Sequence, residues 1–467
     1  MNGIKGTNMK VIVCGAGQVG RGIAQHLAGE GIDVIVVDRA AALMQRISDT
    51  LDVRPIQGHG AYPETLEKAG AADADILIAV TASDEVNMVT CQVAKSLFNV
   101  PKTIARVRDR HYLSGKWQDS LFNRENIPVD VIISPETEVG EAVVRRLALP
   151  GTFDNFGFCD NVVQMIGVSI ETDCPIIDTP LNQLTGLFPD LRAIVVGLER
   201  DGHLYVPDFD DTILAGDKAY LVTAASDTLR TLKIFGHEER EARRIVIVGA
   251  GNIGYQVART LENGRAPYSI SLIEQEEPRA REVAEKLTKS VLLHGDGLSP
   301  EILAEAGVRD ADITLGLTND DQVNVLTTLL GLQEGSVRGM CLINDNSFQR
   351  LAGKFGMEVA INPRAITVSS ILGQVRRGQI IRVHAIGDGA AEALEAEVLE
   401  GSVLVGQKLR ELDLPAGIRF GAMVRADELI TPRGGTEIKI GDRIVVFALS
   451  NAIEDVEHLF PASRQKK

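Results

Sequence analysis

Short apolar runs alternate with amphipathic stretches in the first part of the chain. The pattern predicts a strand over 10–14, a helix over 18–29, a strand over 33–37 and a helix over 40–48. Strands that alternate with helices in this way are typical of βαβ units, which build a parallel sheet covered by helices. We therefore expect an α/β fold of the Rossmann-like, doubly wound type.

After Pro150 the apolar runs come closer together and leave little room for helices. The stretch 193–223 predicts a strand, an Asp-Gly turn, a second strand, a loop and a third strand. The stretch 421–447 has the same order of features, so each is expected to belong to a small α+β domain. Both contain a proline after the second strand and a Gly-Asp pair before the third, namely Pro207 and Pro432, and Gly216-Asp217 and Gly441-Asp442.

The chain is a tandem duplication. Residues 58–91 align without a gap with 295–328, and residues 129–147 resemble 357–375. Matches of this length in the same order indicate two copies of one unit, joined by the charged linker 236–244. The predicted domains are a Rossmann-like domain over 9–150, a small domain over 151–236, a second Rossmann-like domain over 243–378 and a second small domain over 379–462.

Composition and charge argue against several classes of protein. The 467 residues are 45% hydrophobic, enough for several packed domains. The net charge of −16, without a basic stripe or a helix-turn-helix pattern, argues against nucleic-acid binding. Five cysteines without a C-x-x-C pair argue against a disulfide framework and a zinc ribbon, and we expect no metal site.

The chain shows no apolar run long enough to cross a membrane and no apolar signal region at its start. We therefore expect it to stay in the cytoplasm. Residues 1–8, which precede Met9, are expected to be a loose tail or an alternative start.

Two glycine-rich turns, GAGQVG and GAGNIG, each follow a predicted strand and open a predicted helix. In such a turn the first glycine permits the tight bend, the second lets the backbone approach a phosphate, and the third lets helix and strand pack closely. The helix N-terminus then offers free N–H groups to the phosphates. The glycines are Gly15, Gly17 and Gly20 in the first copy, and Gly249, Gly251 and Gly254 in the second.

Asp38 and Glu274 each end the apolar run that follows a glycine-rich turn. A carboxylate at this point accepts hydrogen bonds from the ribose hydroxyls of an adenosine and disfavours a 2′-phosphate. The pattern therefore favours NAD(H) over NADP(H), although Arg39 beside Asp38 weakens this preference in the first copy. ADP and ATP present the same adenosine and phosphates, so the sequence does not separate these ligands from NAD(H).

Thr81-Ala82 and Thr318-Asn319 follow a further predicted strand in the two copies. Ligands of doubly wound sheets lie beyond the carboxyl ends of the strands, so these pairs are expected to line the nucleotide cleft. They can also cap the helix that follows. Arg106, at the end of the fifth predicted strand, is placed to reach phosphates or a neighbouring subunit. The second copy has no arginine there and has Asp296 in place of His59, so the two sites are expected to differ.

The chain resembles the TrkA family in its motifs GAGQVG, VVD, QGHG, TASDEVN and ARVR, in the duplication and in the two small domains, from Met9 to Phe460. This family comprises the cytosolic regulatory subunits of bacterial Trk potassium-uptake systems, each built from two RCK (regulator of potassium conductance) units. The resemblance implies Rossmann-like halves that bind NAD(H), ATP or ADP. It also implies a ring beneath a TrkH-like potassium-translocating membrane protein. Rings of single-unit RCK chains typically hold eight units, so a two-unit chain is expected to close as a tetramer.

The same resemblance implies which residues bind the nucleotide. They are Gly15, Ala16, Gly17, Gln18, Val19, Asp38, Thr81, Ala82 and Arg106 in the first copy, and Gly249, Ala250, Gly251, Asn252, Ile253, Glu274, Thr318 and Asn319 in the second.

The main alternative is an NAD-dependent dehydrogenase of an unknown small substrate. Such an enzyme needs an acid–base group and a substrate pocket beside the nicotinamide. The two small domains share no His, Lys or Cys at matching positions, which argues against it. An NADH-responsive repressor would need a DNA-binding helix pair and a basic face, and neither is indicated. We therefore expect a nucleotide-sensing regulator of potassium transport without catalytic residues.

Overall fold

The computed structural model describes residues 9–461 except 114, 265, 346–347, 349–356, 358 and 376–379. The predicted tail 1–8 and the predicted domain boundaries at 378–379 and at 462 lie outside the described residues. The chain divides into two compact units, Met1–Pro135 with Arg364–Arg377, and Glu136–Pro363 with Gly378–Lys467. Among the described residues, every helix is too short or too polar to cross a membrane.

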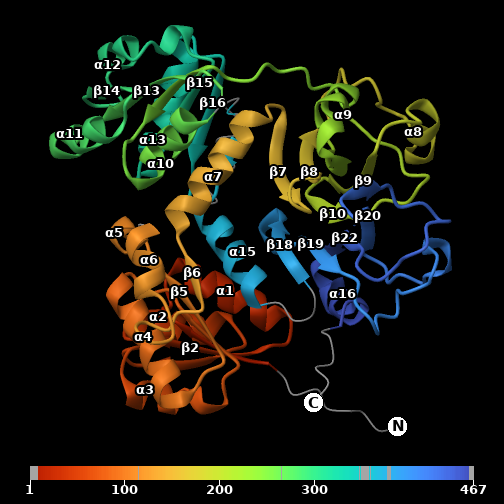
Figure 1. Ribbon diagram of the computed structural model, residues 1–467. Helices are drawn as coiled ribbons and strands as arrows, with labels where there is room; N and C mark the ends of the chain where they lie inside the picture. The colour runs from red at the N-terminus through yellow and green to blue at the C-terminus, as the bar shows by residue number, and fades with distance from the viewer. Residues whose placement is uncertain are drawn as a thin grey trace, which may run out of the picture. The chain divides into compact units, whose positions relative to one another are not determined.

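The first unit is built on a six-stranded sheet of order β3-β2-β1-β4-β5-β6, which Figure 1 shows in red and orange. Neighbouring strands are parallel throughout. The strand order reverses between β1 and β4, and this is the place where doubly wound sheets bind their ligands. The strands are β1 (Lys10–Cys14), β2 (Asp33–Asp38), β3 (Arg54–Gln57), β4 (Ile76–Ala79), β5 (Lys102–Arg106) and β6 (Val131–Ile133).

Helices cover both faces of this sheet, each burying an apolar stripe. α1 and α2 contribute Ile23 and Ile47 to the core on one face. α3 and α4 contribute Leu66 and Cys91 to the core on the other face. The helices are α1 (Gln18–Gly29), α2 (Ala41–Thr50), α3 (Pro63–Lys68), α4 (Asp84–Phe98), α5 (Arg110–Leu113) and α6 (Gly115–Leu121). The Rossmann-like fold predicted from the alternating pattern is thus confirmed.

The helix that follows the last strand of each Rossmann-like sheet packs with the other copy. α15 (Pro363–Val375) follows the second sheet, yet its Ile371 lies in the core of the first sheet. Its counterpart α7 (Pro135–Ala148) follows the first sheet, yet a Cβ on its Gly140 would lie 2.8 Å from Cγ of Gln256 in the second copy. The sequence duplication does not indicate this exchange, and the four-segment division stays a prediction.

The second unit contains a matching six-stranded parallel sheet of order β14-β13-β12-β15-β16-β17. Its strands are β12 (Arg244–Val248), β13 (Ser269–Glu274), β14 (Val291–His294), β15 (Ile313–Gly316), β16 (Arg338–Leu342) and β17 (Val359–Ile361). Its helices are α10 (Asn252–Asn263), α11 (Glu277–Lys286), α12 (Pro300–Glu305) and α13 (Asp321–Glu334).

Two five-stranded antiparallel sheets form the small domains, as predicted. They share a core in which Phe158 and Tyr220 of the first sheet meet Phe447 of the second. The first, of order β10-β9-β11-β8-β7, consists of β7 (Thr152–Phe158), β8 (Val163–Ser169), β9 (Ala193–Arg200), β10 (His203–Tyr205) and β11 (Lys218–Ala224), with α8 (Leu181–Leu187) and α9 (Thr228–Ile234). The second, of order β18-β19-β22-β20-β21, consists of β18 (Ile380–Ile386), β19 (Ala391–Glu397), β20 (Ile418–Arg425), β21 (Glu428–Ile430) and β22 (Arg443–Leu449), with α16 (Ile453–Leu459).

Candidate functional site

The three glycines of the first glycine-rich turn have different environments: two are required by the fold, and at the remaining one a side chain would meet no neighbouring atom. Gly15 has φ +117°, in the region that side chains rarely adopt, and a Cβ on Gly20 would lie 1.8 Å from the Gly15 carbonyl oxygen. Both positions therefore require glycine for the fold itself. A Cβ on Gly17, in contrast, would meet nothing within 4 Å. Among the described residues no atom fills the space over Gly17, so the backbone at this position is open.

The turn of the second copy has the same three environments. Gly249 has φ +100°, a Cβ on Gly254 would lie 1.9 Å from the Gly249 carbonyl oxygen, and a Cβ on Gly251 would meet nothing within 4 Å. The open position is therefore the second glycine in both copies, which is the one that admits phosphate in this turn.

The helices that open at these turns have no side-chain cap. α1 and α10 begin after Gly17 and Gly251, and neither helix carries an acidic residue in its first turn. The first N–H groups of a helix lack partners within the helix, and they carry the positive end of the helix dipole. These helix ends, with Gln18-Val19 and Asn252-Ile253 as their first residues, are suited to hold an anion.

The predicted ribose carboxylates lie directly beside the glycine-rich turns. Asp38 Oδ2 accepts a hydrogen bond from Ala16 N at 2.7 Å, and Glu274 Oε2 accepts one from Ala250 N at 2.9 Å. The second oxygen of Asp38 accepts from Ala40 N at 2.9 Å. Each carboxylate therefore fixes the shape of its turn, in addition to any contact with a ribose.

A buried asparagine holds the loop after the fourth strand in each copy. Asn87 Oδ1 accepts from Thr81 N at 2.8 Å and from Thr81 Oγ1 at 2.7 Å. Asn324 Oδ1 accepts from Thr318 N and Thr318 Oγ1, both at 2.7 Å. A Cβ on Gly15 would lie 2.9 Å from Thr81 N, so the loop and the glycine-rich turn are in direct contact.

The residues that follow these threonines, Ala82 and Asn319, are both exposed. The Ala82 carbonyl accepts a hydrogen bond from Arg108 Nη2. The N-cap of α13 is Asp320, which accepts from Gln322 N at 2.8 Å. The N-cap of α4 is Ser83.

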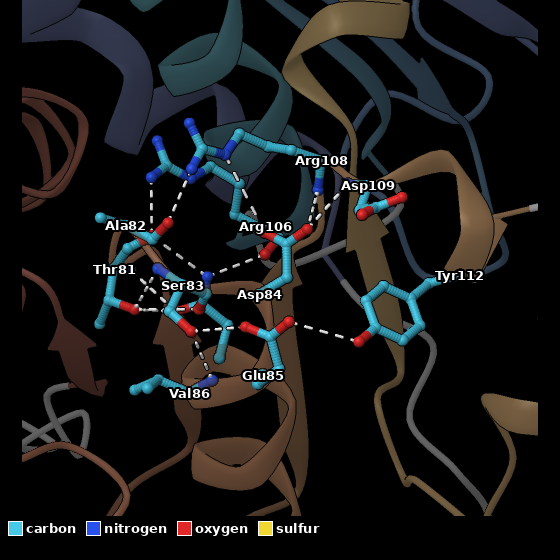
Figure 2. A network of polar contacts seen from close by, with 11 residues as sticks. Thr81, Ala82, Ser83, Asp84, Glu85, Val86, Arg106, Arg108, Asp109 and Tyr112 are labelled. Carbon is cyan, nitrogen blue, oxygen red and sulfur yellow. Dashed lines mark hydrogen bonds and ion pairs between the residues drawn. The ribbon is translucent and has the colours of Figure 1, made fainter.

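Two arginines reach the loop of the first copy, as Figure 2 shows. Arg106 Nη2 donates to the Thr81 carbonyl and Arg108 Nη2 donates to the Ala82 carbonyl, both at 2.7 Å. Asp84 Oδ2 accepts from the backbone N–H groups of Arg108 and Asp109, both at 2.8 Å. Two guanidinium groups therefore stand at the carboxyl edge of β4 and β5, where they can offset phosphate charge.

The second copy keeps the backbone frame at this edge without the arginines. Asp321 Oδ2 accepts from the backbone N–H groups of Asn344 and Asp345, both at 2.9 Å. Leu342 ends β16 where Arg106 ends β5. The predicted difference between the two copies at this edge is therefore present in the structure.

Sequence reasoning missed the anchoring role of Asn87 and Asn324, and it missed Arg108. The asparagines recur at the same place in both copies, in the motifs DEVN and DQVN, and that recurrence was an available signal. Arg108 follows Arg106 by two residues, so both can extend from one side of an extended chain. The predicted positions His59 and Asp296 lie in the loops after β3 and β14, two residues beyond the partners of Asp38 and Glu274 in the sheet.

Comparisons with known proteins agree with the duplicated fold. The TrkA-N domain family matches residues 11–135 and 245–363, and the TrkA-C domain family matches residues 165–236 and 393–460. The Trk system potassium uptake protein TrkA of Azorhizobium caulinodans is 50% identical over 455 residues, which cover 97% of this chain and 99% of the relative. The protein of the same name from Halomonas elongata is 38% identical and covers 97% of this chain and 98% of the relative.

Solved structures with the same fold are more distant in sequence. The GsuK RCK domain superposes with a TM-score of 0.59 at 16% identity and covers 97% of this chain and 95% of that one. The GsuK channel bound to NAD gives a TM-score of 0.59 at 18% identity and covers 97% of this chain and 79% of that one.

Proposed function

The chain belongs to the TrkA family, and from this premise we propose that it is the nucleotide-sensing regulatory subunit of a potassium-uptake system. The observation that carries the proposal is the open second glycine, Gly17 and Gly251, at an uncapped helix N-terminus in both copies. Openness at the second glycine lets the backbone approach a phosphate, and the helix N-terminus that follows offers it free N–H groups.

The ligand that fits is an adenine nucleotide, with NAD(H) as the first candidate and ADP or ATP as others at the same or the second site. The turn residues would hold its phosphates, and Asp38 or Glu274 would hold its ribose. In the first site Arg106 and Arg108 would face the phosphates beyond the first one, because they lie at the edge formed by β4 and β5.

The proposed assembly is a tetrameric ring that binds a TrkH-like potassium-translocating membrane protein, and so sits at the inner face of the membrane. Closed rings are a common form of homo-oligomer. A stable monomer in light scattering at micromolar protein concentration would contradict this assembly.

Nucleotide exchange would act by favouring one of two arrangements of the ring. Moving a two-state equilibrium from one extreme to the other takes about 5.5 kcal/mol of differential binding. Shared among the eight sites of a tetramer, this is ~0.7 kcal/mol a site, which is below the usual coupling energy of 1–3 kcal/mol. Partial occupancy, or sites of unequal quality, would therefore suffice.

The proposal includes no chemical turnover by this protein. A dehydrogenase would need an acid–base group at the nicotinamide end of the cleft. In the first copy the guanidinium groups of Arg106 and Arg108 donate to backbone carbonyls at that edge, and arginine keeps its proton, so these two groups are suited to bind charge rather than to exchange protons with a substrate.

The decisive experiment is potassium uptake in cells that lack their own regulatory subunit. Uptake should be restored by the wild-type chain and should lose its response to nucleotide in the double variant G17V/G251V. G29V and G186V are matched controls, because a Cβ on Gly29 or Gly186 would also meet nothing within 4 Å. Uptake that is the same with and without the protein would contradict regulation, and steady NADH oxidation with a small substrate would favour the dehydrogenase.

Calorimetry on the purified protein should separate the ligands. Titrations with NADH, NAD, ATP and ADP should show binding that is lost in G17V/G251V. Binding of none of the four would contradict the nucleotide proposal.

A further inference from the structure

The loop after the third strand of the first copy carries a pair of stacked rings. The rings of His59 and Tyr62 lie with their centroids 4.5 Å apart and an interplanar angle of 24°. His59 Nδ1 accepts a hydrogen bond from Ala61 N at 3.3 Å, and Gly58 N fastens the loop to the Asp38 carbonyl at 2.9 Å. Because Nδ1 is the acceptor, the neutral imidazole carries its proton on Nε2. Tyr62 is 60% exposed.

The loop of the second copy has the same backbone frame and different side chains. Gly295 N donates to the Glu274 carbonyl at 2.9 Å, as Gly58 does in the first copy. Asp296 takes the place of His59, and its Oδ1 accepts from Leu298 N at 2.9 Å. Ser299 takes the place of Tyr62 and caps α12. An imidazole stacked on a phenol in one copy is therefore replaced by a carboxylate in the other.

These loops lie where a bound nucleotide would place its base. The phosphates belong at the glycine-rich turn after β1, and the ribose belongs at the carboxylate that ends β2. β3 is the next strand beyond β2, and Asp38 pairs with Gln57, two residues before His59. In the second copy Glu274 pairs with His294, two residues before Asp296. A ligand that runs from β1 to β2 therefore continues to these loops.

We propose that the two sites recognise the adenine base by different chemistry. The first site takes the base by stacking against the pair His59–Tyr62. The second site takes it through a hydrogen bond from the exocyclic amino group of adenine to Asp296. This inference rests on the proposed function, because it names how each nucleotide site reads its ligand.

The two modes have different selectivity. Stacking requires only a flat aromatic face, and it tolerates changes at the edge of the base. A carboxylate requires a donor at that edge, because an acceptor placed against it repels it and leaves it desolvated without a partner. The first site is therefore permissive toward the base, whereas the second site is selective for an amino group.

The test compares ADP with etheno-ADP, whose additional ring turns the amino nitrogen of adenine into an acceptor. Each site is studied alone, in the full-length chain, by closing the other site with G17V or G251V. In G17V, where the second site remains, ADP should bind about tenfold more tightly than etheno-ADP. In G251V, where the first site remains, the two affinities should agree within about threefold.

Two further variants separate hydrogen bonding from the larger size of etheno-ADP. D296N keeps an oxygen that can accept from Leu298 N and turns the second carboxylate oxygen into an NH₂ donor. In the G17V background it should weaken ADP and strengthen etheno-ADP, so that the tenfold preference disappears. H59D, in the G251V background, should give the first site the preference for ADP. Thermal melts show whether each variant folds.

The outcomes distinguish this inference from the function on which it rests. If neither single-site protein binds ADP, ATP, NAD or NADH, the proposed nucleotide sites are wrong. If both bind ADP with the same ratio to etheno-ADP, or if D296N leaves the ratio unchanged, nucleotide binding stands and the proposed base recognition is wrong.

Discussion

The two Rossmann-like copies differ at the rim of the cleft and agree at its centre. In both, the same glycines shape the turn, a carboxylate binds the N–H after the first glycine, and a buried asparagine holds the threonine loop. At the rim, Arg106 and Arg108 are replaced by Leu342 and Asn344. The duplication has therefore kept the groups that position backbone, and it has changed the side chains that would read the outer parts of a ligand.

The two small domains do not show such a difference. A polar contact that recurs in both has almost the same geometry in each. Arg200 binds Asp217 through Nε at 2.8 Å and Nη2 at 2.7 Å. Arg425 binds Asp442 through Nε at 2.7 Å and Nη2 at 2.8 Å. Both aspartates also accept a backbone N–H from the turn before the last strand of the motif. These pairs hold a turn in place, and this structural role is the same in both small domains.

The largest effect is expected from the glycine-rich turns. G17V and G251V should each abolish nucleotide binding at one site, by about 100-fold or more, because the new methyl groups fill the space of a phosphate. Melting temperatures should stay close to wild type, since a Cβ meets no atom within 4 Å at either position. Calorimetry and thermal melts measure the two quantities.

The matched comparison is G20V, in which the new Cβ would lie 1.8 Å from the Gly15 carbonyl oxygen. This variant should lose folding of the first Rossmann-like domain rather than binding alone. Normal nucleotide binding by G17V, with one strong phase for each copy, would show that the shared centre is not a phosphate site.

The second-largest effect is expected from the carboxylates of Asp38 and Glu274. D38A and E274A should each weaken one nucleotide phase by about 1.5–3 kcal/mol, the range for a hydrogen bond to a charged group. Asp38 also accepts from Ala16 N and Ala40 N, so D38A should cost stability as well as binding. D38N keeps an acceptor for the turn and separates the two effects. Equal titrations for wild type and the D38A/E274A double variant would contradict the assignment.

The sequence was sufficient for the parts of the molecule that repeat. The spacing of the apolar runs and turn residues predicted both kinds of domain. The spacing of Asp38 from Gly15 predicted a contact with a ribose, which stays a prediction, whereas the hydrogen bond from Ala16 N to Asp38 was not predicted. The sequence could not indicate the exchange of α7 and α15, because an exchanged helix buries the same apolar stripe as one that stays with its own sheet. It also did not indicate that Asn87 faces inward, since asparagine near a helix N-terminus is usually explained by capping.

The first small domain should lose stability on acidification. Burial raises the pKa of Asp217, but hydrogen bonds from Arg200 and Leu214 N outweigh it, so the pKa lies below its ordinary value of 3.8. A depressed pKa in the folded state means that the pair stabilises the protein above pH 3.8 and that this contribution is lost as the pH falls through the folded pKa.

D217N should therefore destabilise the protein by about 1–2 kcal/mol at neutral pH and by less in acid. Urea unfolding between neutral pH and the acid range measures the difference. A constant difference between wild type and D217N at every pH would contradict this role for the pair.

The smallest effect is expected at the rim, where R106L gives the first copy the leucine that the second copy already has at position 342. We expect ATP at the first site to weaken by about 1.5-fold to fivefold, the range for a partly exposed charge contact, with the second site unchanged. Arg106 also donates to the Thr81 carbonyl at 2.7 Å, so it can act by holding the loop rather than by meeting phosphate. AMP separates the two roles, because it lacks the outer phosphates. A loss of ATP affinity that exceeds the loss of AMP affinity indicates charge recognition, whereas equal losses indicate positioning.

The reverse variant L342R should strengthen ATP binding at the second site if the shared backbone frame is sufficient to place a guanidinium there. If R106L and L342R both leave ATP binding unchanged, the two sites do not differ in the way that their rims suggest.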